Sequence, residues 1–207
     1  MLNEGIRMSE EKWSFEQFLR NTFKRPLDSI AGFLLRIGVT ANAVTVFGLV
    51  VSAAAAVLIG MGQLLPGGLI LLFGAPMDAL DGALARLSGK SSNFGAFLDS
   101  VTDRYEEIFV FGGLLFYFLQ AGDALACVLV FVSAAGSVLV SYVKARAEAL
   151  GFEAKVGLFS RVGRLVILIP CLIFNIPLVA LWILAIFTNV TAIQRFIHVQ
   201  RQSRLGQ

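Results

Sequence analysis

Four aspartates lie within one of the most apolar parts of this sequence, at spacings that bring them together. Asp78 and Asp81 are three residues apart, and Asp99 and Asp103 are four residues apart. On a helix, the two members of each pair share one face. A carboxylate inside a membrane costs roughly 2.5–3.5 kcal/mol on insertion scales, and four together also repel one another. We therefore expect cations to neutralise this cluster.

The chemistry expected of the cluster is that of hard divalent cations. Carboxylates that face each other across two antiparallel helices match a site for Mg²⁺ or Mn²⁺, and no His or Cys is placed to suit zinc. Two such ions could clamp a pyrophosphate and stabilise both its attacking and its leaving oxygen. Gly82 would let a ligand approach the helix backbone closely, and Arg86 would add positive charge beside the phosphates.

Composition indicates the kind of fold that must position these residues. The chain has 207 residues, of which 57% are hydrophobic and 15% are charged, and its mean hydropathy is +0.79. Soluble domains are usually about 45–50% apolar and about 25% charged. We therefore expect an all-α, polytopic membrane protein. The net charge of +3 is explained by membrane topology, so no nucleic-acid partner is expected.

The hydropathy pattern predicts six transmembrane helices after an amphipathic one. Residues 13–36 alternate apolar and basic side chains, which favours a helix at the membrane interface over an ordinary surface helix. Residues 1–41 are thus a cytoplasmic N-terminal segment, and residues 42–207 are the transmembrane domain. Asn93 is the expected N-cap of the third span. The spans are expected at about 42–62, 66–87, 94–119, 122–147, 158–174 and 176–197.

The basic residues set the orientation of these spans. All 17 Lys and Arg fall in the N-terminal segment, the second-to-third connection, the fourth-to-fifth connection or the tail, which lie on one side. The positive-inside rule makes that side cytoplasmic, with both termini inside and the chain in the cell (inner) membrane. The aspartates would then lie about two to three helical turns from the cytoplasmic interface, and the site would face the cytoplasm.

The cluster is part of a longer pattern, D-x2-D-G-x2-A-R-x8-G-x3-D-x3-D. This pattern resembles the signature of the CDP-alcohol phosphotransferases, enzymes with six spans that follow an amphipathic helix. They move a phosphatidyl-type group from a CDP-linked lipid, such as CDP-diacylglycerol, to an alcohol and release CMP in phospholipid biosynthesis. Every fixed position is present here: Asp78, Asp81, Gly82, Ala85, Arg86, Gly95, Asp99 and Asp103.

The resemblance implies a role for each residue of the pattern. Asp78, Asp81 and Asp99 would hold metal, with two ions of Mg²⁺ or Mn²⁺ in the site. Asp103 would contact the second ion and act as the catalytic general base on the acceptor hydroxyl. The resemblance also implies a homodimer among membrane lipids. The CDP group of the donor would be bound by Asp78, Gly82, Ala85 and Arg86.

Basic residues at the cytoplasmic helix ends indicate which alcohol accepts the phosphatidyl group. The segments 141–148 and 157–164 resemble the phosphatidylinositol-phosphate synthase branch of the family, in which a lysine and two arginines bind the phosphate of inositol phosphate. The implied acceptor is a phosphorylated polyol, inositol 1-phosphate. The chain departs from that branch at Ser160, Val162 and Gly163, where acidic residues are common, and at Ala41, where proline is usual. The matching basic positions would be Lys144, Arg164 and Arg195, and Arg161 would help them bind the phosphate.

Other functions remain open from the sequence alone. The acceptor could be glycerol 3-phosphate or an unphosphorylated alcohol such as serine, because the positive-inside rule by itself places basic residues at inner helix ends. A cation channel or transporter is the non-enzyme alternative, since acids within a membrane mark ion pathways. The outer halves of the spans, such as residues 49–61 and 109–118, are almost wholly apolar, which argues against transport.

Overall fold

The computed structural model describes residues 15–89, 92–154, 156–157 and 159–205, without the side chains of residues 15–23 and 205. Within these residues the chain forms helices and no strand, which confirms the all-α prediction. The predicted start of the N-terminal helix at residue 13 lies outside them. The helices are α1 (Phe15–Arg36), α2 (Ala41–Gly60), α3 (Leu64–Gly74), α4 (Met77–Ser88), α5 (Asn93–Gln120), α6 (Ala124–Ala149), α7 (Arg161–Ile173) and α8 (Pro177–Leu205).

Four helical segments of the described chain are long and apolar enough to cross a membrane: Ala41–Gly60, Leu64–Ser88, Ala124–Ala149 and Pro177–Arg204. The spans expected at 94–119 and 158–174, which correspond to α5 and α7, are not among these four segments. The first half of α5 carries several charged residues, and α7 has 13 residues. At 1.5 Å per residue, α7 is about 20 Å long, less than a hydrocarbon core of about 30 Å. The chain is therefore a helical membrane protein, and the count of six spans stays a prediction.

The second predicted span is broken in the middle. We expected one helix over 66–87, but α3 ends at Gly74 and α4 begins at Met77. Pro76 precedes α4, where its missing N–H removes no helical hydrogen bond. The break lets the two halves pack differently, because α3 contacts α7 whereas α4 contacts α1. Asp78 and Asp81 consequently lie in the first turns of a separate helix.

Side-chain caps fix the starts of α2 and α5. The hydroxyl of Ser92 accepts a hydrogen bond from the backbone N–H of Gly95 at 3.0 Å, so Ser92 is the N-cap of α5. The prediction that Asn93 caps this helix was wrong by one position, because Asn93 is already helical. Thr40 caps α2 by accepting from the N–H of Ala43 at 3.2 Å, although Ala41 replaces the usual proline.

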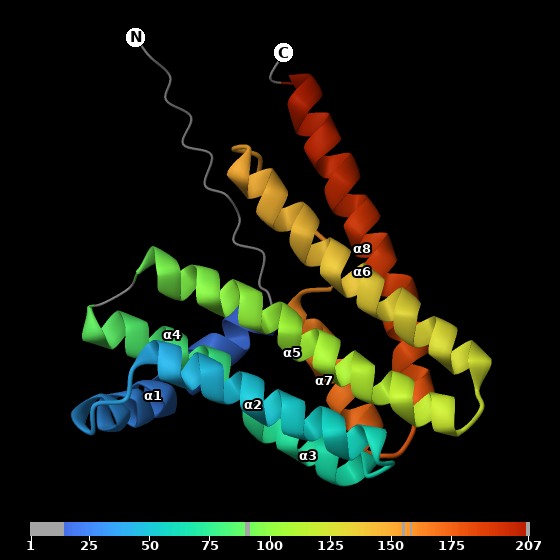
Figure 1. The fold of residues 1–207 in the computed structure, drawn as a ribbon. Helices are drawn as coiled ribbons and strands as arrows, with labels where there is room; N and C mark the ends of the chain where they lie inside the picture. Colours follow the sequence, from blue (N-terminus) through green and yellow to red (C-terminus); the bar gives the residue numbers. More distant parts are fainter. Residues whose placement is uncertain (1–14, 90–91, 155, 158, 206–207) are drawn as a thin grey trace.

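Close helix contacts hold the bundle together. Figure 1 shows α6 and α8 side by side, diverging from α4 and α5. Gly113 on α5 faces α2, where an added Cβ would collide with the carbonyl oxygen of Ala56. Gly136 on α6 is equally close to Thr188 on α8. Small residues at such contacts let helix backbones approach, which is a main source of packing energy between helices in membranes.

Two buried apolar clusters position the helices that carry the aspartates. The larger one joins α2, α3, α5, α6, α7 and α8 through residues such as Ile59, Leu114, Leu172 and Leu184. The smaller one holds α1 against α2 and α4, and it consists of Ala31, Val44, Ala83 and Leu84. Large apolar side chains such as Phe73 and Phe131 remain 75% and 72% exposed on the outer surface, as expected for a surface that faces lipid.

The contact of α2 with α5 predicts different effects of alanine at two neighbouring glycines. Gly113→Ala should destabilise the protein by about 1–3 kcal/mol, as other overpacking substitutions do, because its methyl group must push α2 away. For a chain of this size, this corresponds to a melting temperature lower by roughly 2–12 °C in detergent. Gly112→Ala is the matched control, since no atom lies within 4 Å of its added Cβ. Equal melting temperatures of the two variants would contradict this packing.

Candidate active site

The four aspartates of the sequence pattern meet where α4 faces α5. Single carboxylate oxygens of Asp78, Asp81 and Asp99 lie within 4.8 Å of one another. Asp78, Asp103 and Glu106 form a second such group. Asp78 belongs to both groups, so it joins them into one acidic site, which we define as these five residues.

The acidic site has the chemistry of a hard-cation site. Its ligand atoms are carboxylate oxygens, and both groups of three contain neither His nor Cys. Mg²⁺ and Mn²⁺ prefer such oxygen ligands. The residues present therefore fit the divalent ions that the sequence predicts, and the ligands would be Asp78, Asp81, Asp99 and Asp103.

A buried hydrogen bond orients Asp81. The hydroxyl of Thr45, on α2, donates to Oδ2 of Asp81 at 2.7 Å. Both residues are buried, with exposed fractions of 7% and 6%. A hydrogen bond of this kind restricts the rotation of the carboxylate and aims its other oxygen. Thr45 therefore connects α2 to the acidic site.

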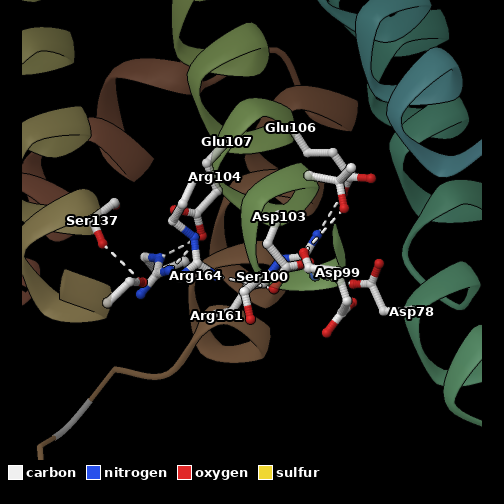
Figure 2. A network of polar contacts seen from close by, with 12 residues as sticks. Asp78, Asp99, Ser100, Asp103, Arg104, Glu106, Glu107, Ser137, Arg161 and Arg164 are labelled. Carbon is white, nitrogen blue, oxygen red and sulfur yellow. Dashed lines mark hydrogen bonds and ion pairs between the residues drawn. The ribbon is translucent and has the colours of Figure 1, made fainter. Parts of the chain in front are cut away.

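An arginine of α7 reaches into the acidic site. Figure 2 shows the guanidinium group of Arg161 among Asp78, Asp103 and Glu106. Its Nη1 contacts both Asp78 and Asp103, and its Nη2 contacts Glu106. A single cation thus connects carboxylates of two different helices, α4 and α5. Arg104 adds a second positive charge, with its Nη2 at 2.9 Å from Asp103 Oδ2.

Next to this contact lies a buried ion pair between α5 and α7. Oε1 of Glu107 accepts hydrogen bonds from Nε of Arg164, at 3.1 Å, and from its Nη2. The two residues are 9% and 4% exposed. Arg161 and Arg164 can both face α5 because they are three residues apart in the first turns of α7. Ser160 caps this helix by accepting from the N–H of Gly163 at 3.3 Å.

Several residues of this site were not predicted from the sequence. Glu106 and Glu107 lie three and four residues after Asp103, so they continue the acidic face of α5, and this spacing was the available signal. Thr45 was signalled only by its polarity within an apolar span. Arg161 was assigned to the acceptor phosphate, but in the structure it contacts the carboxylates.

The residues assigned to the CDP group lie on the same helix as Asp78. A Cβ added to Gly82 would meet only Nη1 of Arg86, at 3.6 Å, so the described protein does not fill the space beside this glycine. The side chain of Arg86 is 51% exposed and lies 3.9 Å from Asp28 of α1. Ala85, which precedes Arg86 in the sequence, is half-buried. This face of α4 therefore leaves room for a ligand next to the aspartates.

The residues assigned to the acceptor phosphate lie in two places. Arg161 and Arg164 are at the acidic site, as described above. Lys144 is exposed on α6, with its Nζ 3.9 Å from Glu148. Arg195 is buried on α8, where its Nε donates to the carbonyl of Val156 at 2.9 Å and its Nη1 to the carbonyl of Val140 at 2.6 Å. Their joint role in acceptor binding stays a prediction.

Known proteins resemble this chain in sequence. A phosphatidylinositol phosphate synthase of Mycobacterium marinum is 40% identical over 187 residues, which cover 85% of this chain and 80% of the relative. An archaetidylinositol phosphate synthase of Pyrococcus horikoshii is 33% identical over 189 residues, which cover 91% of this chain and 98% of the relative. The similarity therefore covers at least four fifths of this chain and of each relative.

Solved structures and a family model agree with these relatives. The crystal structure of Mycobacterium tuberculosis phosphatidylinositol phosphate synthase with CDP-DAG bound matches with a TM-score of 0.80 and 34% identity, over 84% of this chain and 94% of that one. The structure of the same enzyme with manganese and citrate also has a TM-score of 0.80 at 34% identity, over 84% and 88%. The family model described as CDP-alcohol phosphatidyltransferase matches residues 38–194. The chain therefore belongs to the CDP-alcohol phosphatidyltransferase family of membrane enzymes.

Proposed function

We propose that this enzyme transfers a phosphatidyl group from CDP-diacylglycerol to a hydroxyl of inositol 1-phosphate and releases CMP. The observation that carries this proposal is the acidic site, in which the aspartates of the family pattern converge beside an open face of α4. The names of both sequence relatives contain inositol phosphate, which supports this acceptor over glycerol 3-phosphate.

The proposed ions are two divalent cations, Mg²⁺ or Mn²⁺, held by Asp78, Asp81, Asp99 and Asp103. The carboxylate-only ligand set supports them, and so does the manganese in the similar structure. When bound, such ions would supply charge neutralisation for the diphosphate of the donor and for the leaving CMP.

Asp103 is proposed as the general base. The acceptor oxygen forms a bond to the phosphorus that carries the lipid, and the bond from this phosphorus to the bridging oxygen breaks. CMP leaves with that electron pair, and a carboxylate oxygen of Asp103 accepts the hydroxyl proton. The half-buried side chain of Asp103 at the junction of α4, α5 and α7 supports this role.

The donor and the acceptor are proposed to approach from different sides of the acidic site. Gly82, Ala85 and Arg86 bind the CDP group along α4, with Asp78 at the metal. The acceptor phosphate is bound by the basic residues of α6, α7 and α8, because a phosphate dianion needs several charged donors. These residues are Lys144, Arg161, Arg164 and Arg195.

The proposed topology follows from the charge distribution. Six spans within the domain 42–207 place both termini and the acidic site on the cytoplasmic side of the cell membrane. The N-terminal segment 1–41 includes α1, which is proposed to lie at the interface. The exposed apolar side chains of Ile30 and Phe33 on α1 support this position. A homodimer is proposed by analogy with the family.

Removal of metal should abolish activity. EDTA is expected to stop CMP release from CDP-diacylglycerol, and Mg²⁺ or Mn²⁺ to restore it. Asp78→Asn, Asp81→Asn and Asp99→Asn should each remove most activity, because each deletes a charge that the ions need. Asp123→Asn is the matched control: Asp123 caps α6 by accepting from the N–H of Ala126 at 2.9 Å, and Asn can also cap a helix. Full turnover in EDTA would contradict the metal assignment.

Asp103→Asn should separate catalysis from donor binding. The loss of a general base is expected to lower kcat about 10²–10⁴-fold. Binding of CDP-diacylglycerol, measured by calorimetry, should fall less than in the Asp78→Asn variant, because Asp103 acts in the transition state. An equal loss of donor binding in both variants would make Asp103 a ligand only.

The acceptor assignment predicts a specific rise in KM. Lys144→Ala, Arg164→Ala and Arg195→Ala should each raise KM for inositol 1-phosphate about ten- to a hundredfold, as expected for charge-assisted contacts of roughly 1.5–3 kcal/mol. Donor binding should change little. Arg146→Ala is the control, since Arg146 is an exposed basic residue at the same end of α6. Turnover of free inositol equal to that of inositol 1-phosphate would contradict this assignment. The basic residues would then set the membrane orientation and would not recognise the acceptor.

A further inference from the structure

Arg161 occupies the place where the two groups of carboxylates join. Its Nη1 contacts Asp78 and Asp103, and Asp78 is the residue that both groups share. Its side chain is only 17% exposed. Ligand oxygens that lie within 4.8 Å of one another leave room for one cation among them. A divalent ion bound by Asp78 and Asp103 would therefore compete with the guanidinium group for the same oxygens.

The charges of the site also indicate that the guanidinium group of Arg161 and a divalent ion bind the aspartates in turn and not together. Carboxylates outnumber guanidinium groups two to one in this region, so the arginines alone neutralise only half of the negative charge. A guanidinium in contact with a divalent ion would be repelled strongly at this depth. The carboxylates are Asp78, Asp81, Asp99, Asp103, Glu106 and Glu107, and the arginines are Arg104, Arg161 and Arg164.

Arg161 also has a contact apart from the aspartates. Its Nη2 contacts Glu106, which could keep this contact while Nη1 leaves the aspartates. Gly48 of α2 makes room for Glu106, because a Cβ there would lie 3.1 Å from Oε1 of Glu106. Glu106 is therefore held against α2 beside the arginine.

A cavity adjoins the guanidinium group. Its volume is about 40 Å³, and its lining is mostly apolar but includes Glu106, Glu107, Arg161 and Arg164. Three buried atoms of these residues have no hydrogen-bond partner among the described residues: Arg161 Nε, Arg164 Nη1 and Glu107 Oε2. A water needs roughly 10–15 Å³ and two to four polar partners, so this cavity can hydrate a displaced guanidinium.

We propose that Arg161 is an internal counter-cation of the acidic site. It bridges Asp78 and Asp103 until a divalent ion binds, gives up both contacts to the ion, and stays attached to Glu106, its positioning residue. Arg161 thereby weakens ion binding and keeps the ion-free site intact. This inference depends on the proposed metal dependence of the enzyme.

Titration with Mn²⁺ tests the proposal without any substrate. Electron paramagnetic resonance of free Mn²⁺ gives the dissociation constant for the purified protein in detergent. Arg161→Gln should lower this constant at least tenfold, because the ion no longer displaces a cation. The melting temperature of the ion-free variant should fall, and its rise on addition of Mn²⁺ should exceed that of the wild type.

Arg164→Gln is the matched control. It separates the effect of direct contact with the aspartates from the effect of a positive charge nearby. Arg164 has the same charge and lies three residues further along α7, but it contacts Glu107 instead of the aspartates. Its substitution should change the Mn²⁺ dissociation constant less than threefold. If Arg161→Gln does not fold, Arg161→Lys replaces the planar fork with a single ammonium and should tighten Mn²⁺ binding by a smaller factor.

The role of Glu106 is tested by a double-mutant cycle. Glu106→Gln should weaken Mn²⁺ binding at least threefold in the wild type, because the displaced arginine loses its remaining partner. In the Arg161→Gln background the same change should have a much smaller effect. An equal effect in both backgrounds would overturn the assignment of Glu106 as the partner of the displaced arginine, because Glu106 would then act on the ion directly.

Two other results would overturn the proposal. One is unchanged or weaker Mn²⁺ binding by a folded Arg161→Gln protein, and the other is equal tightening by Arg164→Gln. In both cases the proposed function survives if CMP release still depends on the ion. Absence of Mn²⁺ binding to the wild type and to both arginine variants would overturn the metal assignment as well.

Discussion

The structure depends on the negative charge that is concentrated inside an apolar bundle. Carboxylates buried together repel one another and lose their hydration, so they need cations in contact. The ion pairs that α7 makes with Asp78, Asp103, Glu106 and Glu107 meet part of this need. The remaining negative charge makes the site attractive to divalent ions.

The placement of the helices follows from this constraint. The break at Ala75 and Pro76 gives Asp78 and Asp81 a helix of their own, which packs on α1 instead of on α7. The cap at Ser160 starts α7 at the position from which Arg161 and Arg164 both reach α5. Close contacts between helices then keep these charged faces together. The apolar clusters pack the helices that carry the charged residues of the site.

Much of this arrangement could be predicted from the sequence. The spacing of the aspartates, the apolar stretches and the basic residues led to an all-helical membrane protein with a carboxylate cluster between neighbouring helices. The helix bounds agree closely for α2 and α5, because caps and apolar residues are local signals. The break in the second span was missed, since Pro76 was read as part of an apolar run.

Contacts between distant segments could not be predicted in the same way. Arg161 and Glu106 are far apart in the sequence, and their pairing depends on how α5 and α7 pack. The basic residues at inner helix ends have similar local patterns, so the sequence does not distinguish Arg161 on the carboxylates from Lys144 on an exposed face. Only the packing of the helices separates the two kinds of residue.

The most direct test of the account is an anomalous diffraction measurement at the manganese edge on crystals grown with Mn²⁺. Anomalous peaks are expected among Asp78, Asp81, Asp99 and Asp103. Arg161 is expected to have left Asp78 and Asp103 while it still contacts Glu106. Crystals of folded protein with no peak at these aspartates, and with Arg161 still bridging Asp78 and Asp103 at saturating Mn²⁺, would contradict the account.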